Sequence, residues 1–414
     1  MNAEVIATGS ELFSDTLNTN GIYISGKLLS LGINVVRQTV VGDSPKEMES
    51  AIKEALSRSN IIIITGGLGP TFDDITCEIV CKVLGKKLVF SREALSSIAA
   101  YFAALNKQMN KINEKQAYIA EGAVPILNSA GTAPGQIIKS DDKLVVLLPG
   151  PHRELRIMFE KDVFPFLKKK YERGIVKIKI FHTTGVPESV INEKIKDIVT
   201  LEKKLEEGSL KFSILAHVTG VDIKMVVSGT NEMLMDKTLR NIAFEIRGLL
   251  KEDIYSEDGK SMEKVICELL VKAHKNLAVA ESCTGGLLAH KITNVTGSSA
   301  VFLGGMVTYS DFMKKTILGV KEETITNFKA VSRETAGEMA ECVRKIMASD
   351  FGLSTTGVAG PGKSSDGIPA GTAYIALARD SGTIIKELKF AGSRAEIKAK
   401  IVQAALDMLR RELM

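Results

Sequence analysis

The sequence predicts an α/β protein with more than one domain, and three observations lead to that prediction. Short apolar strands alternate with segments of helical periodicity near both ends of the chain. Ile61–Thr65 and Leu144–Leu148 are apolar runs typical of central parallel strands that are buried on both faces. Glycines follow several of these strands, and the 414 residues are enough for two or three domains.

The first domain, placed at residues 1–170, is predicted to be a doubly wound parallel sheet. Ser44, Pro45 and Glu47 form a capping-box pattern that begins a helix, with the proline at its first position. The predicted strands are Val5–Thr8, Val35–Val41, Ile61–Thr65 and Leu144–Leu148, and the predicted helices are Asn18–Leu31, 45–59 and Asp73–Leu84.

The middle domain, placed at residues 175–255, is predicted to be a small α+β unit of βαββα order. Its elements are a strand at 177–184, a helix at 188–205, two strands around Val218–Gly220 and a helix at 231–250. It contains no glycine-rich phosphate loop, so we interpret it as a linker or dimerisation module.

The third domain, placed at residues 258–414, is again predicted to be α/β. Ser332 begins one helix, and Ser393 with Glu396 forms a capping box that begins the last helix. The other predicted elements are a helix at 262–274 and strands at 277–280, 301–309, 352–356, 372–378 and 384–390.

Composition argues against several classes of function. The 54 basic and 49 acidic residues are scattered and leave a net charge of only +5, so we expect no direct nucleic-acid contact. No apolar run reaches the ~18 residues that span a membrane, and the N-terminus does not resemble a signal peptide. Five cysteines without a CxxC pattern favour reduced thiols, and therefore a cytoplasmic location.

A first candidate site follows the strand at Ile61–Thr65. The glycines of residues 65–74 would let the backbone approach a ligand, and the next helix would offer its N–H groups to a phosphate. Segments 8–11, 41–43 and 149–151 leave apolar strands at the same sheet edge. Their carboxylates suggest a divalent cation, although Asp73 and Asp74 could instead cap the helix.

These segments resemble the molybdopterin-binding (MoaB/MogA-like) domain of the competence/damage-inducible CinA family. The matching motifs are TGSEL, VVGD, TGGLGPTFDDIT, NSAGTAPG and LLPGPHRE. The resemblance implies hydrolysis of ADP-ribose to AMP and ribose 5-phosphate with a divalent cation, Mg or Co, and a potassium ion as a further candidate. It implies metal ligation by Glu11, Asp43 and Asp74. It implies nucleotide binding by Gly9, Ser10, Asn18, Asn20, Gly66, Gly67, Gly69, Gly131 and Gly150.

The third domain carries a second candidate site. Residues 357–364 match the Walker A pattern, but turn-forming residues follow where a P-loop requires a helix, so we reject a nucleoside triphosphatase. Ser299, Tyr309 and Lys314 could instead serve as a nucleophile, a proton relay and a neutral base. Each could also have an ordinary structural role, and Cys283 at a helix start is a rival nucleophile that we rank lower.

The third domain is similar to the C-terminal domain of the same family over nearly its whole length. The matching motifs are AESCTGGLLAHKIT, GSSAVFLGGMVTYS, TTGVAGPG and GTAYIALA, followed by Ser393 and Arg394. The resemblance implies hydrolysis of the carboxamide of nicotinamide mononucleotide (NMN) to nicotinate mononucleotide and ammonia, without a cofactor. It assigns catalysis to Ser299, Tyr309 and Lys314, and substrate binding to Thr356, Arg394, Gly285 and Gly286.

We therefore expect an NMN amidase with a second, metal-dependent ADP-ribose pyrophosphatase site, acting on free nucleotides as a homodimer. The alternative is a nucleotide- or pterin-binding adaptor in competence or the DNA-damage response that performs no catalysis. Salt-sensitive DNA binding would favour that alternative.

Overall fold

The computed structural model describes residues 1–171, 174–200 and 208–414, which divide into two compact units. One unit holds residues 1–177 and 228–235, and the other holds residues 178–227 and 236–414. Within the described ranges, no helix is both long and apolar enough to cross a membrane.

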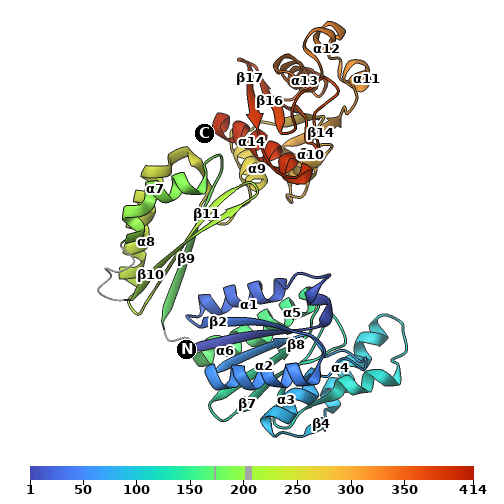
Figure 1. Ribbon diagram of the computed structural model, residues 1–414, viewed down its shortest axis with the longest axis vertical. Helices are drawn as coiled ribbons and strands as arrows, with labels where there is room; N and C mark the ends of the chain where they lie inside the picture. Colours follow the sequence, from blue (N-terminus) through green and yellow to red (C-terminus); the bar gives the residue numbers. More distant parts are fainter. Residues whose placement is uncertain (172–173, 201–207) are drawn as a thin grey trace. The chain divides into compact units, whose positions relative to one another are not determined.

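The first unit is built on a six-stranded sheet in the order β2-β1-β3-β8-β7-β6 (Figure 1). Neighbouring strands among β2, β1, β3 and β8 are parallel, whereas β7 and β6 are antiparallel. This is the doubly wound arrangement that the sequence predicted. The elements are β1 Asn2–Thr8, α1 Thr19–Ser30, β2 Asn34–Val41, α2 Pro45–Arg58, β3 Ile61–Thr65, α3 Thr76–Leu84, β4 Leu88–Phe90, α4 Arg92–Ala104, β5 Tyr118–Ala120, β6 Val124–Ile126, β7 Gly135–Ser140, β8 Lys143–Leu148, α5 His152–Met158 and α6 Phe164–Tyr171.

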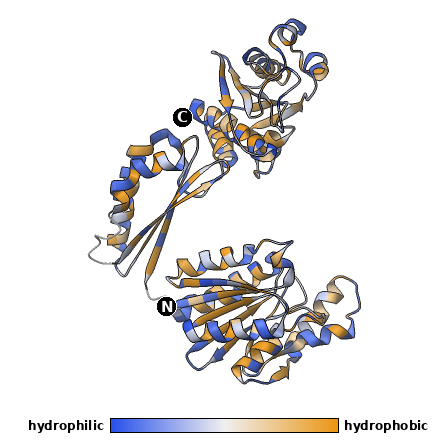
Figure 2. Ribbon diagram, in the orientation of Figure 1, coloured by the Kyte–Doolittle hydropathy of each residue, from blue (hydrophilic) through white to orange (hydrophobic). Residues whose placement is uncertain are grey.

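Strand β3 shows why this sheet has a core on each face. Ile61 and Ile63 pack with the side chains of α1, α5 and α6, whereas Ile62 and Ile64 pack with those of α2 and α3. All four are completely buried, and burial of each isoleucine contributes roughly 1.5–3 kcal/mol. Figure 2 shows the resulting pattern of hydrophobic strands between helices that are hydrophobic on one side only.

The helix predicted at Asp73–Leu84 begins later, at Thr76. Asp74 accepts hydrogen bonds from the backbone N–H and hydroxyl of Thr71, at 2.9 and 2.5 Å. Asp73 accepts from the same hydroxyl. These bonds close residues 71–74 into a turn, so neither aspartate caps α3 and the predicted boundary was wrong.

The middle segment has the predicted βαββα order and one added strand. Its sheet runs β10-β11-β9-β12, with β12 antiparallel to β9. The predicted helix 188–205 ends as α7 at Val199, and its predicted residues 201–205 lie outside the described ranges. The elements are β9 Ile175–Thr183, α7 Glu188–Val199, β10 Ser209–His217, β11 Gly220–Gly229, α8 Glu232–Leu250 and β12 Ile254–Ser256.

The C-terminal domain is a five-stranded sheet in the order β14-β13-β15-β16-β17. β14, β13 and β15 are parallel, and β16 and β17 are antiparallel. The elements are α9 Met262–Ala273, β13 Leu277–Glu281, α10 Leu287–Thr293, β14 Phe302–Val307, α11 Asp311–Met313, α12 Glu322–Phe328, α13 Arg333–Ile346, β15 Phe351–Gly357, β16 Thr372–Arg379, β17 Gly382–Lys389 and α14 Arg394–Leu413.

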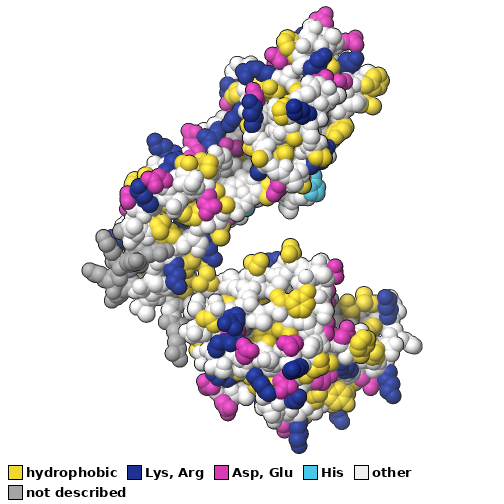
Figure 3. All heavy atoms as spheres, in the orientation of Figure 1, with side chains coloured by type: hydrophobic (Ala, Val, Ile, Leu, Met, Phe, Trp, Pro, Cys, Tyr) yellow, Lys and Arg dark blue, Asp and Glu magenta, His cyan; other side chains and the backbone are white. Residues whose placement is uncertain are grey.

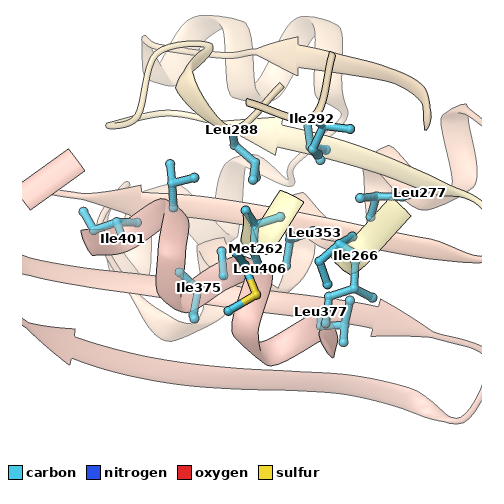
Figure 4. Packing of buried hydrophobic residues seen from close by; sticks show 14 of the residues in the cluster. Met262, Ile266, Leu277, Leu288, Ile292, Leu353, Ile375, Leu377, Ile401 and Leu406 are labelled. Carbon is cyan, nitrogen blue, oxygen red and sulfur yellow. The ribbon is translucent and has the colours of Figure 1, made fainter. Parts of the chain in front are cut away.

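The two faces of this sheet also have separate cores. Leu277 packs with Met262 and Ile266 of α9, Leu288 of α10 and Leu406 of α14 (Figure 4). On the other face, side chains of β13 pack against α13. β14 ends at residue 307, two residues before the predicted end, so Tyr309 lies in the turn after the strand.

Candidate functional sites

Four segments of the first unit meet at a cleft of about 320 Å³. They follow β1, β2, β3 and β8, and they are the segments that the sequence predicted to converge. Parallel strands present their carboxyl ends at one edge of a sheet, which is why the four loops meet there. The lining includes Thr8, Gly9, Glu11, Asp43, Gly66, Gly67, Gly69, Asp73, Asp74, Pro149, Gly150 and Glu154.

Gly66 lets two of these loops touch. Its φ is +100°, and a side chain there would overlap the carbonyl oxygen of Thr8. Its N–H donates to the carbonyl of Leu148 at 2.9 Å, which joins the loop after β3 to the end of β8. The close backbone approach therefore requires glycine at this position.

Asp43 holds the loop after β1 in place. Its Oδ2 accepts hydrogen bonds from the backbone N–H of Ser10 at 3.0 Å and from the Ser10 hydroxyl at 2.7 Å. Asp74 performs the same task for residues 71–74, as its bonds to Thr71 show. Lys115, which the sequence reasoning missed, donates to the carbonyls of Thr71 and Asp74 at 3.0 and 2.6 Å.

The two predicted asparagines do not line the cleft, but Asn20 bonds to a residue that does. Asn18 caps α1 by accepting from the N–H of Gly21 at 2.9 Å. Asn20 donates to the carbonyl of Gly150 at 2.7 Å, and its oxygen lies 2.8 Å from Nδ1 of His152. At Gly131, an added side chain would overlap the carboxylate of Glu154. These residues position the loops around the cleft.

The cleft contains oxygen ligands of the kind that a hard cation prefers, but its side chains alone do not form a complete set of metal ligands. Glu11, Asp43 and Asp74 supply carboxylate oxygens along its wall. Among the residues that the structure describes, no three acidic, histidine or cysteine side chains cluster closely enough to hold an ion. Mg²⁺ is commonly bound by one or two carboxylates together with substrate phosphates. The residues therefore fit a cation that shares its ligands with a bound diphosphate.

Lys314 is the central feature of the second site, in the C-terminal domain. Its side chain is 1% exposed, and its Nζ lies 3.4 Å from the carbonyl oxygen of Tyr309. Asp311 is its one ion-pair partner within the described ranges, at 3.8 Å, and that carboxylate is largely exposed. Burial therefore outweighs the attraction of Asp311 and lowers the pKa of Lys314 below its usual 10.5.

Tyr309 contacts this lysine through its backbone carbonyl and contacts Arg394 through its hydroxyl. Nη2 of Arg394 donates to the hydroxyl of Tyr309 at 2.9 Å, and Nη1 donates to the carbonyl of Gly360. Because the tyrosine oxygen accepts from the arginine, its own proton is left to donate to a ligand. Arg394 is the first residue of α14, so its charge lies beside free helix N–H groups. Together they provide an anion-binding corner.

Thr356 is fully buried, and its hydroxyl donates to the carbonyl of Ala330 at 2.7 Å. Its hydroxyl therefore fixes the end of β15 to the segment before α13. Thr308, which directly follows β14, has a buried hydroxyl with no hydrogen-bond partner within the described ranges. Sequence reasoning did not identify Thr308, because an unpaired hydroxyl has no signature in the sequence.

Glu281 organises the glycine loop and was also missed as an individual residue. Its carboxylate is fully buried and accepts from the N–H groups of Gly286, Leu288 and Ala289 at 2.8–3.0 Å. Gly285 and Gly286 have positive φ values of 60° and 93°. A side chain at Gly285 would lie 3.6 Å from Nζ of Lys398, so this half-buried lysine borders the loop.

Cys283 lies in the same loop but is poorly suited to nucleophilic attack. Burial raises the pKa of its thiol to about 12, against the small lowering effects of its backbone hydrogen bond and of Lys314 and Lys398. The helix-start argument for a thiolate therefore fails here, because desolvation dominates. The thiol is protonated at neutral pH, in keeping with its lower rank.

Of the three predicted catalytic residues, Ser299 lies apart from Tyr309 and Lys314 within a single chain. It lies in the exposed turn Ser298–Ala300 that precedes β14, whereas Tyr309 and Lys314 follow the other end of that strand. β14 has six residues, so its ends are about 20 Å apart at ~3.3 Å per residue. Within one chain, Lys314 therefore cannot take the proton of Ser299.

The Walker-like pattern is not a P-loop. β15 ends at Gly357, and residues 358–371 form turns without a helix before β16 begins at Thr372. Phosphate binding by a P-loop needs that helix, so the structure confirms the rejection of this pattern.

On the face of the molecule that Figure 3 shows, lysine and arginine side chains are interspersed with aspartate and glutamate. The middle segment also contains no Gly-x-x-Gly sequence, the clamp with which KH domains hold a nucleic-acid backbone.

Three family descriptions match successive parts of the chain. Residues 4–169 match a probable molybdopterin binding domain, residues 178–256 match a damage-inducible protein CinA KH domain, and residues 259–413 match the CinA C-terminal domain. The three matches follow one another in the order of the sequence and leave few residues between them.

Full-length relatives and a solved structure bear the same family name. A CinA-like protein of Endomicrobium trichonymphae is 42% identical, covering 100% of this chain and 99% of its own. A putative competence-damage inducible protein of Caldicellulosiruptor saccharolyticus is 41% identical, covering 100% and 99%. The crystal structure of CinA from Thermoplasma acidophilum is 34% identical, covers 41% of this chain and 99% of its own, and has a TM-score of 0.38. The full-length match to the two relatives shows that the chain belongs to the CinA family of competence/damage-inducible proteins.

Proposed function

We propose that the C-terminal site hydrolyses the carboxamide of nicotinamide mononucleotide to the carboxylate, releasing ammonia. The observation that carries this proposal is the buried Lys314, whose lowered pKa makes a neutral amine available as a base. Its Nζ contacts the backbone carbonyl of Tyr309, and the hydroxyl of the same tyrosine accepts a hydrogen bond from Arg394, which can receive the phosphate of a mononucleotide.

The proposed reaction has two steps. Ser299 gives its proton to Nζ of Lys314 while its oxygen bonds to the carbonyl carbon, and Tyr309 donates a hydrogen bond to the carbonyl oxygen. The C–N bond then breaks, and the departing nitrogen takes the proton from Lys314 to leave as ammonia. Water next attacks the serine ester in the same manner, which releases the acid and restores the serine.

Arg394 is proposed to bind the substrate phosphate. A guanidinium group forms two parallel hydrogen bonds with a phosphate, and the N-terminus of α14 adds its own N–H groups. The bond from Arg394 to Tyr309 would then place the phosphate at a fixed position relative to the base.

For the N-terminal cleft we propose a second activity, the hydrolysis of ADP-ribose to AMP and ribose 5-phosphate. It is supported by a glycine-lined cleft whose wall carries the carboxylates of Glu11, Asp43 and Asp74. A divalent cation held there with the diphosphate would neutralise its charge and polarise the scissile P–O bond. The loops set by Gly66 and Asp43 hold the carboxylates at the cleft wall.

One assay tests both activities. Purified protein is incubated with NMN or with ADP-ribose, with Mg²⁺ or with a chelator, and the products are identified by mass spectrometry. We expect nicotinate mononucleotide with or without metal, and AMP only with metal. Binding of both nucleotides without turnover of either would overturn both proposals and favour the adaptor.

A further inference from the structure

Within one chain, Ser299 is separated from the two residues with which it is proposed to act. The serine precedes β14, and Tyr309 and Lys314 follow it, so the strand itself separates them. A strand is too stiff to fold back on itself, and β14 is fixed along its length by parallel pairing with β13. Ser299 can therefore meet a lysine of this kind only if that lysine belongs to another copy of the chain.

β14 is an edge strand without the usual protection. It pairs with β13 on one side and with no other strand in the described part of the chain. Its sequence, Phe-Leu-Gly-Gly-Met-Val, contains no charged residue and no proline, which are the common means of blocking edge-to-edge pairing. β17, at the opposite edge, carries Lys386, Glu387 and Lys389. The two edges of one sheet therefore differ in their readiness to accept another strand.

Exposed apolar side chains surround the free edge of β14. Leu303 and Val307 on the strand are each 50% exposed, and Phe312 and Ile317 just after it are 63% and 55% exposed. Exposed apolar side chains gathered on one edge mark an interaction surface more often than isolated ones do. The pattern fits burial against a similar apolar edge.

We infer that β14 pairs antiparallel with β14 of a second copy about a two-fold axis, so that Ser299 of the partner subunit completes the site of Tyr309 and Lys314. This inference rests on the proposed amide hydrolysis, because it is that reaction which assigns roles to the three residues. Two identical sites result, and each takes its serine from one subunit and its base from the other.

The register of such a pair is set by symmetry. In an antiparallel pair about a two-fold axis, one residue lies opposite its own copy. With Gly304 on the axis, Leu303 lies opposite Gly305, where a large side chain meets a position with none. Beyond the paired residues, the same arrangement brings the turn that holds Ser299 of one copy to the end of β14 that leads into Tyr309 of the other.

That register also brings the serine to the base. Nζ of Lys314 hydrogen-bonds to the backbone carbonyl of Tyr309, so the amine lies at the end of β14 to which the paired strands bring Ser299 of the partner subunit. Glycine at the axis removes side chains that would hold the two strands apart. One two-fold contact therefore covers an unprotected edge and also assembles the nucleophile with its base.

Subunit complementation tests the inference. Full-length Ser299→Ala and Lys314→Met chains are co-expressed with different affinity tags, and mixed dimers are isolated by two successive purifications. Each parent should be inactive on NMN. The mixed dimer should regain roughly half the wild-type turnover, because one of its two sites contains both intact residues.

The outcomes separate the two proposals. Mixed dimers that stay as inactive as their parents, or failure to obtain any mixed dimer, would overturn the shared site. Parents that retain wild-type turnover would instead overturn the assignment of Ser299 and Lys314, and with it the proposed reaction.

A pair of edge variants gives an independent measurement. Leu303→Glu puts a charge on the free edge of β14, and Ile384→Glu puts one at the opposite edge on β17 as a matched control. We expect Leu303→Glu to abolish NMN turnover while ADP-ribose hydrolysis continues, and Ile384→Glu to preserve both. Wild-type NMN turnover by Leu303→Glu would contradict the paired edge.

Discussion

The N-terminal cleft and the C-terminal site both lie at the carboxyl ends of parallel strands in mixed sheets, yet the charged groups at the two sites have opposite signs. The N-terminal cleft is open, and its wall carries the carboxylates of Glu11, Asp43 and Asp74. The C-terminal site centres on one cation, Lys314, whose burial favours the neutral amine. Both lie where loops leave the carboxyl ends of strands. Similar backbone geometry therefore presents carboxylates at one site and a buried amine at the other.

The two sites are proposed to obtain their reactive groups in different ways. As proposed, the N-terminal cleft acts on a diphosphate through a cation that its carboxylates share with the substrate. The C-terminal domain is proposed instead to obtain its base by burying an amine, because burial favours the neutral form. Burial of that amine is therefore the feature on which the second proposal depends.

Lys314→Met should produce the largest effect and should separate the two sites. Loss of a general base costs about 10²–10⁴-fold in turnover, so we expect NMN hydrolysis to fall by that factor. ADP-ribose hydrolysis should be unchanged. The control is Lys315→Met, which removes the adjacent, more exposed lysine and its ion pair with Glu322. Equal losses of NMN turnover in the two variants would show that burial of Lys314 does not matter. The contrast drawn between the two sites would then be wrong.

Asp74→Asn should reduce the other activity, by about 10–100-fold. The amide keeps the size of the side chain and one oxygen, but it removes a charge that a cation at the cleft would use. Chelation should abolish AMP formation and leave ammonia formation from NMN intact. Asp73→Asn is the control, since Asp73 bonds to the same threonine but is not expected to bind metal. AMP formation that resists chelation would contradict the assignment of a metal to this cleft.

The pH dependence of the C-terminal site should reflect the lowered pKa of Lys314. Only the neutral amine acts as a base, so NMN turnover should rise with pH and level off above that pKa, which lies below 10.5. ADP-ribose hydrolysis should show no such dependence on this group. A rate profile measured for both substrates on one preparation gives the comparison directly.

The same shift predicts a change in stability. Between the folded pKa of Lys314 and 10.5, the unfolded chain binds more protons than the folded chain, so the free energy of unfolding rises with pH across that window. Below the window the amine is charged in both states, and the full cost of burying that charge lowers the free energy of unfolding. Lys314→Met should therefore raise the unfolding temperature of the C-terminal domain at neutral pH. A lowered unfolding temperature would show that the lysine is stabilising.

Much of this arrangement could be predicted from the sequence, because it depends on local pattern. The apolar run at 61–65 predicted a strand buried on both faces, and Ser393 with Glu396 predicted the capping box that begins α14. The meeting of four loops followed from the geometry of parallel sheets. These features need only a few neighbouring residues and the general rules for strands and helices.

What the sequence could not reveal depends on distance through space. The start of α3 was misplaced because aspartates favour both helix caps and turns, and only their bonds to Thr71 decide between the two. The buried carboxylate of Glu281 accepts N–H groups up to eight residues later. The separation of Ser299 from Lys314 becomes visible only when β14 is known to lie straight between them.

Cys283→Ala should have the smallest effect and gives the sharpest check on the choice of nucleophile. The thiol lies in the same loop as the glycines and interacts electrostatically with Lys314, so proximity alone would favour it over Ser299. Its pKa of about 12 argues the other way, since almost no thiolate exists at neutral pH. We expect NMN turnover to stay close to wild type, with a loss of roughly 1 kcal/mol in stability from the small cavity. If turnover instead falls as far as in Lys314→Met, the cysteine is the nucleophile, each chain holds a complete site, and the contrast between the two regions rests on the base alone.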